Sequence, residues 1–433
     1  MSEKNKSSRI AIIDGLRTPF CKAGTHLSHL EADDLGAECI KELVQRSQVN
    51  SDTIDQIIIG NVSQPVKAAN VARVIALKAG LNKYIPAVTV HRNCASGMQS
   101  VTDGCNYIHV GQAKTALVGG TESMSNIPFV YRKEFKVVLE SFMAAKSIGA
   151  KIKALSMFRW KYLNPIIGLK EGLTDPVCGL IMGLTAENLA REFQIDREEQ
   201  DQFALQSHAR VAKAIHEKRF EHEIMTMPNK SDSDVITEDN GVRQNQTIDA
   251  LQKLKPYFDR VNGTVTVGNS SQITDGAAAL ILMSEEEAKK RKLTPMGYIH
   301  DYAYAGLEPH RMGLGPVYAM SRVFETSKFK FTDIDLFEIN EAFAAQVLAC
   351  QKAADSTEFA KKHLKNGKKL GFIDPEKCNV NGGAIALGHP VGTSGTRIIL
   401  TLLHELKRQD KTLGCASLCV GGGQGGAVII ERN

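Results

Sequence analysis

One short stretch of the sequence, VTVHRNCASGMQS at residues 88–100, places a thiol where it could do chemistry. The β-rich run 88–90 precedes Cys94, and the small residues 95–97 that follow can open a helix. Backbone N–H groups and the partial positive charge at a helix N-terminus stabilise a thiolate. Cys94 is therefore a candidate nucleophile, and the alternative is a small buried hydrophobe, as most lone cysteines are.

A histidine with unusual surroundings is the second candidate. His389 is the centre of NGGAIALGHPVGTSG, residues 381–395, which contains five glycines. Such a density of glycine usually marks backbone that passes close to another part of the molecule. His389 also lies between Gly388 and Pro390, which restrict the backbone. The segment predicts a held, functional imidazole, and the alternative is a histidine in a surface loop.

A second thiol lies near the C-terminal end, in CASLCVGGGQGG at residues 415–426. Three glycines there match G-x-G-x-x-G, but the strand-like run 427–433 follows instead of the helix that a dinucleotide site needs. A Rossmann dehydrogenase is therefore excluded. Cys419 is the candidate acid or base, and Cys415, four residues earlier, is predicted to be core. The spacing has no matching His or Cys pair, so we expect no metal site.

Residues 337–346, FEINEAFAAQ, place Asn340 and Glu341 where a strand gives way to a helix. Asn340 could be only an N-cap. It could also orient a water molecule or donate a hydrogen bond to an oxyanion.

Strand and helix patterns alternate along the chain, which favours an α/β fold with a largely parallel sheet covered on both faces. The segments 88–100 and 380–397 echo each other, because each passes from a strand to small residues that open a helix. This similarity suggests an internal duplication. Region 127–250 has weaker strand signals and reads as an insertion. Strands are predicted at 10–15, 57–62, 116–124, 263–269 and 278–284, and helices at 31–47 and 196–220.

The amino-acid composition argues against some classes of protein. The chain has 433 residues, 43% of them hydrophobic, and a formal net charge of +5, which is not the mark of a nucleic-acid binder. Nine scattered cysteines, an odd number, indicate reduced thiols and an intracellular location. The N-terminal segment 1–15 has no apolar run typical of a signal peptide, and no segment approaches the length that spans a bilayer. We therefore expect a cytoplasmic protein.

Taken together, these segments resemble the thiolase family over essentially the whole chain. The specific motifs are HRNCASG around Cys94, NEAFA at 340–344, GGAIALGHPVGTSGTR around His389 and CVGGGQGGA after Cys419. Supporting matches, in chain order, are RTPF (17–20), GGTESMS (119–125), MGLTAEN (182–188), TVGNSSQITDGAAA (266–279) and MGLGPV (312–317).

The resemblance implies a five-layer αβαβα fold built from two similar halves, with an inserted loop domain. It places the N-terminal half at 1–126, the loop domain at 127–250, a return to the N-terminal half at 251–295, and the C-terminal half at 296–433. It also implies a homodimer as the minimum assembly, with a tetramer left open.

Matched residue by residue, the resemblance makes Cys94 the acylated nucleophile and His389 the group that activates it. His389 and a water held by Asn340 form one oxyanion site, and the N–H groups of Cys94 and Gly421 form the other. Cys419 exchanges a proton with the acetyl carbon.

The same resemblance implies that coenzyme A is a co-substrate and not a bound cofactor. Ser271, Met182 and Arg243 match positions that contact it.

The expected activity is CoA-dependent cleavage of a 3-ketoacyl-CoA, with the reverse Claisen condensation on the same path. A short-chain acetyl-CoA acetyltransferase is the alternative, and an inactive thiolase-like lipid carrier is a remote one. A related ketoacyl synthase also uses a cysteine nucleophile, but Cys419 in CVGGGQGG favours a thiolase.

An unusual segment bears on the subtype. Residues 131–165 resemble the thiolase component of trifunctional-type β-oxidation complexes, so a hydratase/dehydrogenase subunit is a possible partner. Apolar residues there suit a peripheral membrane contact through 141–164 or a protein partner. The alternative is a helix that packs over the acyl tunnel or a neighbouring subunit. Within 141–164 the charged residues are all basic: Lys146, Lys151, Lys153, Arg159 and Lys161.

Overall fold

The structure, a computed structural model, describes residues 9–229 and 234–433. Residues 1–8, which begin the segment searched for a signal peptide, lie outside the described residues. The strands are β1 (Ile10–Arg17), β2 (Cys21–Lys22), β3 (Gln56–Gly60), β4 (Ala87–Val90), β5 (Thr115–Ser123), β6 (Phe129–Val130), β7 (Ile166–Ile167), β8 (Met227–Pro228), β9 (Val235–Ile236), β10 (Thr274–Ser284), β11 (Gly297–Gly306), β12 (Leu336–Ile339), β13 (Leu413–Val420) and β14 (Gln424–Arg432).

The α-helices lie both beside the main sheet and in the inserted region. They are α1 (Ala32–Ser47), α2 (Val71–Lys78), α3 (Ser96–His109), α4 (Lys133–Ala144), α5 (Ile148–Ser156), α6 (Gly168–Gly172), α7 (Met182–Glu192), α8 (Arg197–His216), α9 (Ile248–Gln252), α10 (Glu285–Lys290), α11 (Gly315–Thr326), α12 (Ala344–Ala354), α13 (Thr357–His363), α14 (Ala384–Leu387) and α15 (Ser394–Arg408).

The main sheet is mixed. Its strands follow the order β12-β13-β14-β11-β1-β10-β5-β3-β4, and β2 pairs with β10. The parallel pairs are β12–β13, β3–β4 and β3–β5, and the other pairs are antiparallel. The prediction of a largely parallel sheet is therefore wrong. After the insertion β10 pairs antiparallel with β1 and β5, and β13 pairs antiparallel with β14 through the tight turn 421–423. Antiparallel pairs need no crossover helix.

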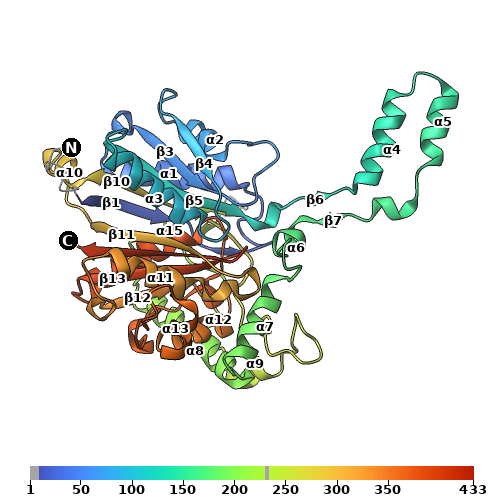
Figure 1. Ribbon diagram of the computed structural model, residues 1–433. Coiled ribbons are helices and arrows are strands. Elements are labelled where there is room, and N and C mark those ends of the chain that lie inside the picture. Colours follow the sequence, from blue (N-terminus) through green and yellow to red (C-terminus); the bar gives the residue numbers. More distant parts are fainter. Residues whose placement is uncertain (1–8, 230–233) are drawn as a thin grey trace.

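The elements lie in five layers, αβαβα, and three clusters of buried hydrophobic side chains lie between them (Figure 1). Helices α1 and α2 cover the outer face of the N-terminal half. Helices α3 and α15 fill the central layer, and α11 and α12 cover the outer face of the C-terminal half. The layers confirm the predicted fold class. The two halves meet in the sheet along a short pairing, Ile10–Ile12 of β1 with Gly297–Ile299 of β11.

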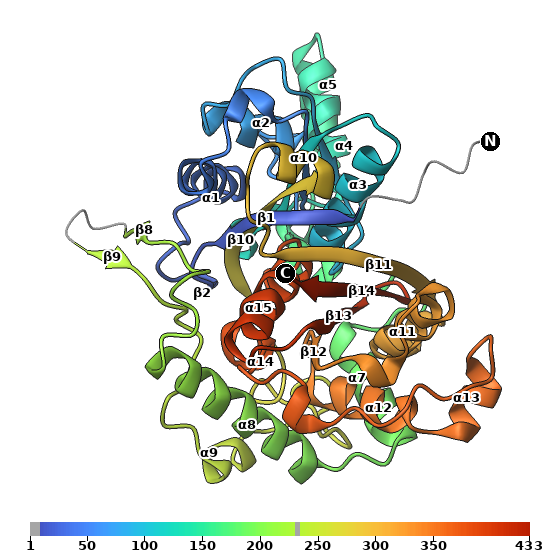
Figure 2. The same cartoon turned by 90° about the vertical axis from the view of Figure 1, so that its left-hand side faces the viewer.

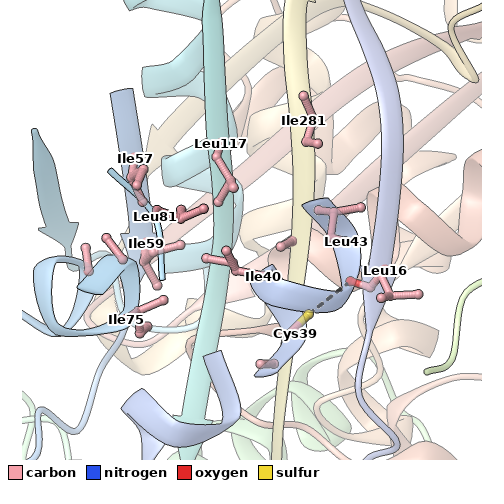
Figure 3. Close-up of a cluster of buried hydrophobic side chains, with 14 of the residues drawn as sticks. Leu16, Cys39, Ile40, Leu43, Ile57, Ile59, Ile75, Leu81, Leu117 and Ile281 are labelled. Carbon is pink, nitrogen blue, oxygen red and sulfur yellow. Dashed lines mark hydrogen bonds between the residues drawn. The ribbon is translucent and has the colours of Figure 1, made fainter. Parts of the chain in front are cut away.

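The outer core of the N-terminal half shows why the predicted elements form (Figure 3). Helix α1 directs Cys39, Ile40 and Leu43 onto the strands, and all three are almost fully buried. They meet Leu117 of β5 and Ile281 of β10, which are also buried. The helical spacing of these apolar side chains gives α1 one face that belongs in the core.

Most predicted elements are confirmed, and one is wrong. Strands occupy the predicted regions at 10–15, 57–62, 116–124 and 278–284, and helices those at 31–47 and 196–220. Residues 263–269 are an irregular loop instead of a strand. Polar contacts hold this loop: the Glu187 carboxylate accepts from the N–H groups of Thr264 and Val265 at 2.9 and 2.8 Å. Side-chain acceptors thus replace the partner strand that the alternating pattern predicted.

The inserted region has two distinct parts. Helices α7, α8 and α9 pack beside α12 and α14, on the C-terminal half (Figure 2). Helices α4 and α5 instead pack against each other and form an arm that extends away from the body, on the two strands β6 and β7 (Figure 1). The arm therefore does not cover an acyl tunnel in its own chain. No helix within the described ranges is long and apolar enough to cross a membrane.

Candidate active site

A tight turn presents Cys94. It lies between β4 and α3, at the strand-to-helix junction that the sequence predicts. Asn93 adopts the left-handed region with φ 42°, and its Nδ2 donates to the Gly421 carbonyl at 2.6 Å. The Ser96 hydroxyl donates to the Asn93 carbonyl at 2.7 Å. These bonds fix the cysteine turn against the glycine-rich segment of the other half.

Two opposing effects act on the Cys94 thiol. Burial raises its pKa, whereas the backbone N–H groups of Gly421 and of Cys94 itself lower it. The net direction is upward, so the helix N-terminus does not by itself make the thiolate the favoured form. A nearby base must therefore take the thiol proton for Cys94 to act as a nucleophile.

His389 is held as a neutral imidazole. Burial lowers its pKa to about 3, and the positive charge of Arg397 adds to this effect. The preceding Gly388 has φ 100°, and a Cβ there would lie 2.2 Å from a methyl carbon of Thr274. The His389 N–H donates to the Gln272 carbonyl at 2.9 Å. The turn is thus rigid and buried, which contradicts the alternative of a surface loop histidine.

Ser394, which the sequence reasoning missed, sets the tautomer of His389. Its Oγ lies 2.5 Å from His389 Nδ1 and 3.1 Å from the Pro390 carbonyl oxygen. A carbonyl can only accept, so the single hydroxyl proton goes to Pro390. The hydroxyl then accepts from Nδ1–H, which leaves Nε2 with its lone pair. Nε2 is buried and has no partner, so it is available as a base.

Cys419 lies at the end of β13, before the turn that leads into β14. Gly422 and Gly423 in this turn have φ 91° and 80°, which only glycine adopts readily. Burial raises the pKa of Cys419 well above its ordinary value, and the neighbouring Cys94 thiol adds to the rise. Cys419 is thus a protonated thiol close to Cys94. Cys415 is fully buried in the outer cluster of the C-terminal half, as predicted.

Asn340 follows β12 and is fully buried. Both its amide atoms, Nδ2 and Oδ1, lack a hydrogen-bond partner. Burying an unpaired amide is costly, so such a group marks a place for a water molecule or a substrate oxygen. Asn340 is not the N-cap of α12, which is Phe343. The N-cap interpretation is therefore wrong.

Glu341, next along the chain, has a structural role. Its carboxylate accepts from Ser207 Oγ at 2.6 Å, Asn379 Nδ2 at 2.9 Å and the Ile385 N–H at 3.3 Å. It thereby joins α8, the 379 turn and α14 beside the Asn340 backbone.

Glu122 is a second buried carboxylate that the sequence reasoning missed. It accepts from the N–H groups of Ser63 at 2.9 Å, Val62 at 3.1 Å and Gly392 at 2.8 Å. Gly392 belongs to the His389 turn, so Glu122 ties this turn to the N-terminal half. Its position in the GGTESMS motif was the available signal, but the motif alone does not reveal these partners.

The three predicted coenzyme A contacts lie on different elements. Met182 begins α7 and packs in the cluster that contains Cys419. The Ser271 N–H donates to the Ala342 carbonyl at 2.9 Å, close to the Asn340 segment. Arg243 lies beside His208, whose Nδ1 accepts from the Arg243 N–H at 3.2 Å. Burial lowers the pKa of His208 to about 4, and the charges of Arg243 and Lys22 add to this effect. Lys22 is a basic neighbour of Arg243 that the motifs did not indicate.

In the part of the chain that the structure describes, no cluster of three or more His, Cys, Asp or Glu side chains could hold a metal ion. The site instead combines a partly buried thiol, a neutral imidazole whose Nε2 has no hydrogen-bond partner, and a second, buried thiol. With the layered two-half fold, this combination defines a thiol-dependent acyltransferase.

Comparisons with known proteins identify the family. The model of the thiolase N-terminal domain matches residues 10–286, and that of the thiolase C-terminal domain matches residues 293–432. A 3-ketoacyl-CoA thiolase of Pseudoalteromonas translucida is 37% identical, and the match covers 100% of both chains. An acetyl-CoA acetyltransferase of Escherichia coli is 41% identical, over 97% of this chain and 98% of that one. The chain belongs to the thiolase family.

Solved structures of thiolases have the same fold as this chain. Human mitochondrial 3-ketoacyl-CoA thiolase has a TM-score of 0.86 at 37% identity, covering 98% of this chain and 99% of that one. The same human enzyme in complex with CoA gives a TM-score of 0.85, again at 37% identity and with 98% of each chain covered.

Proposed function

We propose that this thiolase cleaves 3-ketoacyl-CoA with coenzyme A, through an acyl group carried on Cys94. The observation that carries the proposal is the neutral imidazole of His389, whose buried Nε2 has no hydrogen-bond partner and can serve as the base for the partly buried thiol of Cys94. A thiolate is the suitable nucleophile for the C3 carbonyl, and a neutral imidazole is the base that generates it.

Three residues have separate roles in the proposed cleavage: His389, Cys94 and Cys419. His389 takes the proton of Cys94, whose sulfur attacks C3, and the C2–C3 bond breaks with its electron pair on C2. The Cys419 thiol gives its proton to C2, which releases acetyl-CoA. The Cys419 thiolate then takes the thiol proton of coenzyme A, whose sulfur attacks the acyl-Cys94 thioester. This expels the Cys94 thiolate, which regains its proton from His389.

Two oxyanions form along this path and need separate donors. The N–H group of Gly421, which faces the Cys94 sulfur, and that of Cys94 would hold one. A water on the unpartnered amide of Asn340, together with His389, would hold the other. A single oxyanion donor typically contributes about 10²–10³ in rate.

Coenzyme A would be bound by Ser271, Met182 and Arg243, as a co-substrate. Arg243 and its neighbour Lys22 give two positive charges that suit phosphate groups. The CoA complex of the human relative supports coenzyme A binding.

The acyl-chain length separates two subtypes, fatty-acid β-oxidation and short-chain acetyl-CoA acetyltransfer. The relatives include both names. Thiolysis rates for 3-ketoacyl-CoA substrates from four to sixteen carbons test this, with Cys94→Ala as the inactive control and Cys178→Ala as a matched control for cysteine removal. We expect a preference for long chains. Activity confined to acetoacetyl-CoA would establish the acetyltransferase, and no activity would support the lipid carrier.

We further propose that the α4–α5 arm contacts an anionic membrane surface from a cytoplasmic location. Met143, Ile148, Ile152 and Trp160 on the arm are 82, 79, 63 and 81% exposed. The basic residues of segment 141–164 are exposed on the same arm. Liposome flotation tests the contact: the wild type should float with anionic vesicles, and a variant with Lys→Glu changes at 146, 151 and 153 should not. Equal behaviour of the two would point to a protein partner, such as a hydratase/dehydrogenase subunit.

The assembly is proposed to be a homodimer in which β4 of one chain pairs with β4 of the other, or a tetramer made of two such dimers. β4 ends the main sheet and pairs on one side only, with β3. A free sheet edge is a ready template for a second copy of the chain.

A further inference from the structure

A buried ion pair outside the reacting groups joins the two segments that carry His389 and Asn340. Arg397 Nη1 lies 2.6 Å from Glu338 Oε1, and the two side chains are 0% and 4% exposed. Arg397 belongs to α15, the helix that follows the His389 turn. Glu338 belongs to β12, two residues before Asn340. A charged pair this deep in the protein is expensive to desolvate and is weak evidence for stability alone.

The alternation of side chains along β12 places Glu338 and Asn340 on the same face of the sheet. Leu336 contributes to the central cluster, whereas Phe337 and Ile339 contribute to the outer cluster of the C-terminal half. Side chains two residues apart on a strand share a face, so Glu338 and Asn340 face the central layer. Helix α15 lies in this layer. The ion pair therefore crosses the same interface at which the Asn340 amide stands unpartnered.

We propose that Arg397 is a positioning residue of the acyl-transfer site, whose ion pair with Glu338 fixes the His389 helix against the Asn340 strand end. This inference rests on the proposed function, because it assigns Arg397 to the same site. The pair keeps the imidazole of His389 and the amide of Asn340 at a fixed separation. A water molecule on Asn340 and the His389 ring need this fixed separation to bind the same oxyanion. Misplacement by about 1 Å can reduce a rate about 100-fold.

The charge of Arg397 has a second effect on the site. Together with burial, it lowers the pKa of His389, which keeps Nε2 unprotonated. Two buried carboxylates hold the backbone on either side of His389: Glu122 accepts from the Gly392 N–H, and Glu341 accepts from the Ile385 N–H. Loss of Arg397 would therefore remove a positive charge that disfavours the protonated imidazole.

The test compares four variants with the wild type. Arg397→Met removes the cation, Glu338→Gln keeps an acceptor for it, and Arg397→Met with Glu338→Leu replaces the whole pair by apolar groups. Arg311→Met is the matched control, because Arg311 is a buried guanidinium paired with Glu192 at 2.5 Å and lies on neither α15 nor β12. Each variant is checked by circular dichroism and thermal unfolding before its kinetics are measured.

For the double variant we expect kcat for thiolysis to fall about 10- to 100-fold, with KM for coenzyme A nearly unchanged. The pH below which iodoacetamide no longer alkylates Cys94 should rise. Glu338→Gln should retain more activity than Arg397→Met, and Arg311→Met should leave kcat and the alkylation profile as in the wild type.

Three results would overturn the inference. They are a folded double variant with wild-type kcat and alkylation profile, an equal loss in Arg311→Met, and failure of all three pair variants to fold, which would make the pair purely structural. A wild-type protein without thiolysis would instead refute the proposed function, so the two failures are distinguishable.

Discussion

At the residue scale, the proposed base His389 depends on Ser394, a neighbour within its own turn. Cys94, His389 and Cys419 lie in motifs whose composition is unusual. Ser394 lies in GTSG, where a serine among glycines has no distinguishing pattern. Its role depends on a hydroxyl that meets an imidazole 2.5 Å away and a carbonyl 3.1 Å away. Such a relation follows from the shape of the turn, which sequence spacing does not reveal.

Replacing Ser394 tests the tautomer argument. In Ser394→Ala, Nδ1 of His389 loses its acceptor, so the proton can move to Nε2 and block the base. We expect kcat to fall about 100-fold, within the range for general-base catalysis. KM for coenzyme A should change little. Steady-state thiolysis and the rate of Cys94 alkylation measure the two effects.

Ser394→Thr is the control, because it retains a hydroxyl at the same position. It should keep most of the activity if the added methyl group is accommodated. A fully active Ser394→Ala would contradict the assignment of the tautomer to Ser394.

At the element scale, periodicity predicted most strands and helices but not how the strands pair. The same alternation of strands and helices is compatible with parallel and antiparallel neighbours. The direction of β10 depends on where the chain re-enters after the insertion, and no local pattern encodes this. Likewise, 263–269 alternates like a strand, but Glu187 supplies the acceptors that a strand partner would. The division of the chain at 126, 250 and 295 stays a prediction.

The tie between β5 and the His389 turn predicts a pH effect on stability. Burial raises the pKa of Glu122 to about 7. A carboxyl whose folded pKa exceeds its unfolded value binds its proton more tightly in the folded state. Its contribution to the free energy of unfolding therefore falls as the pH rises from the unfolded pKa to about 7. It is constant above that pH.

Glu122→Gln should remove this contribution. The difference in the free energy of unfolding, wild type minus variant, should decrease by a few kcal/mol between pH 4.5 and 7, at about 1.4 kcal/mol per pKa unit. Urea unfolding at several pH values measures it. A difference that does not change with pH would show that Glu122 has an ordinary pKa.

At the scale of the whole molecule, the site is built from both halves. Cys94 comes from the N-terminal half, and His389, Cys419 and Asn340 come from the C-terminal half. The Asn93–Gly421 and Glu122–Gly392 bonds join the two halves at the site itself. An internal duplication, suggested because each half repeats the passage from a strand to small residues that open a helix, stays a prediction.

The free edge of the sheet predicts the assembly. Val88 of β4 is 37% exposed. In Val88→Lys, a dimer paired across β4 would bring like charges together, which is unfavourable. We expect light scattering to show a dimer or tetramer for the wild type and a shift toward monomer for Val88→Lys. Val110→Lys, at an exposed position beyond α3, is the control and should not change the mass. An unchanged mass for Val88→Lys would place the interface elsewhere.

The central claim is that Cys94 carries the acyl group, and mass spectrometry of the acylated protein tests it most directly. After incubation with acetyl-CoA and rapid digestion, we predict one acetyl group on the peptide that contains Cys94. Cys94→Ala should show none. Cys419→Ala should still form the adduct but fail to exchange protons at the acetyl carbon. An acetyl group on Cys419 in place of Cys94, or turnover in Cys94→Ala, would contradict the account.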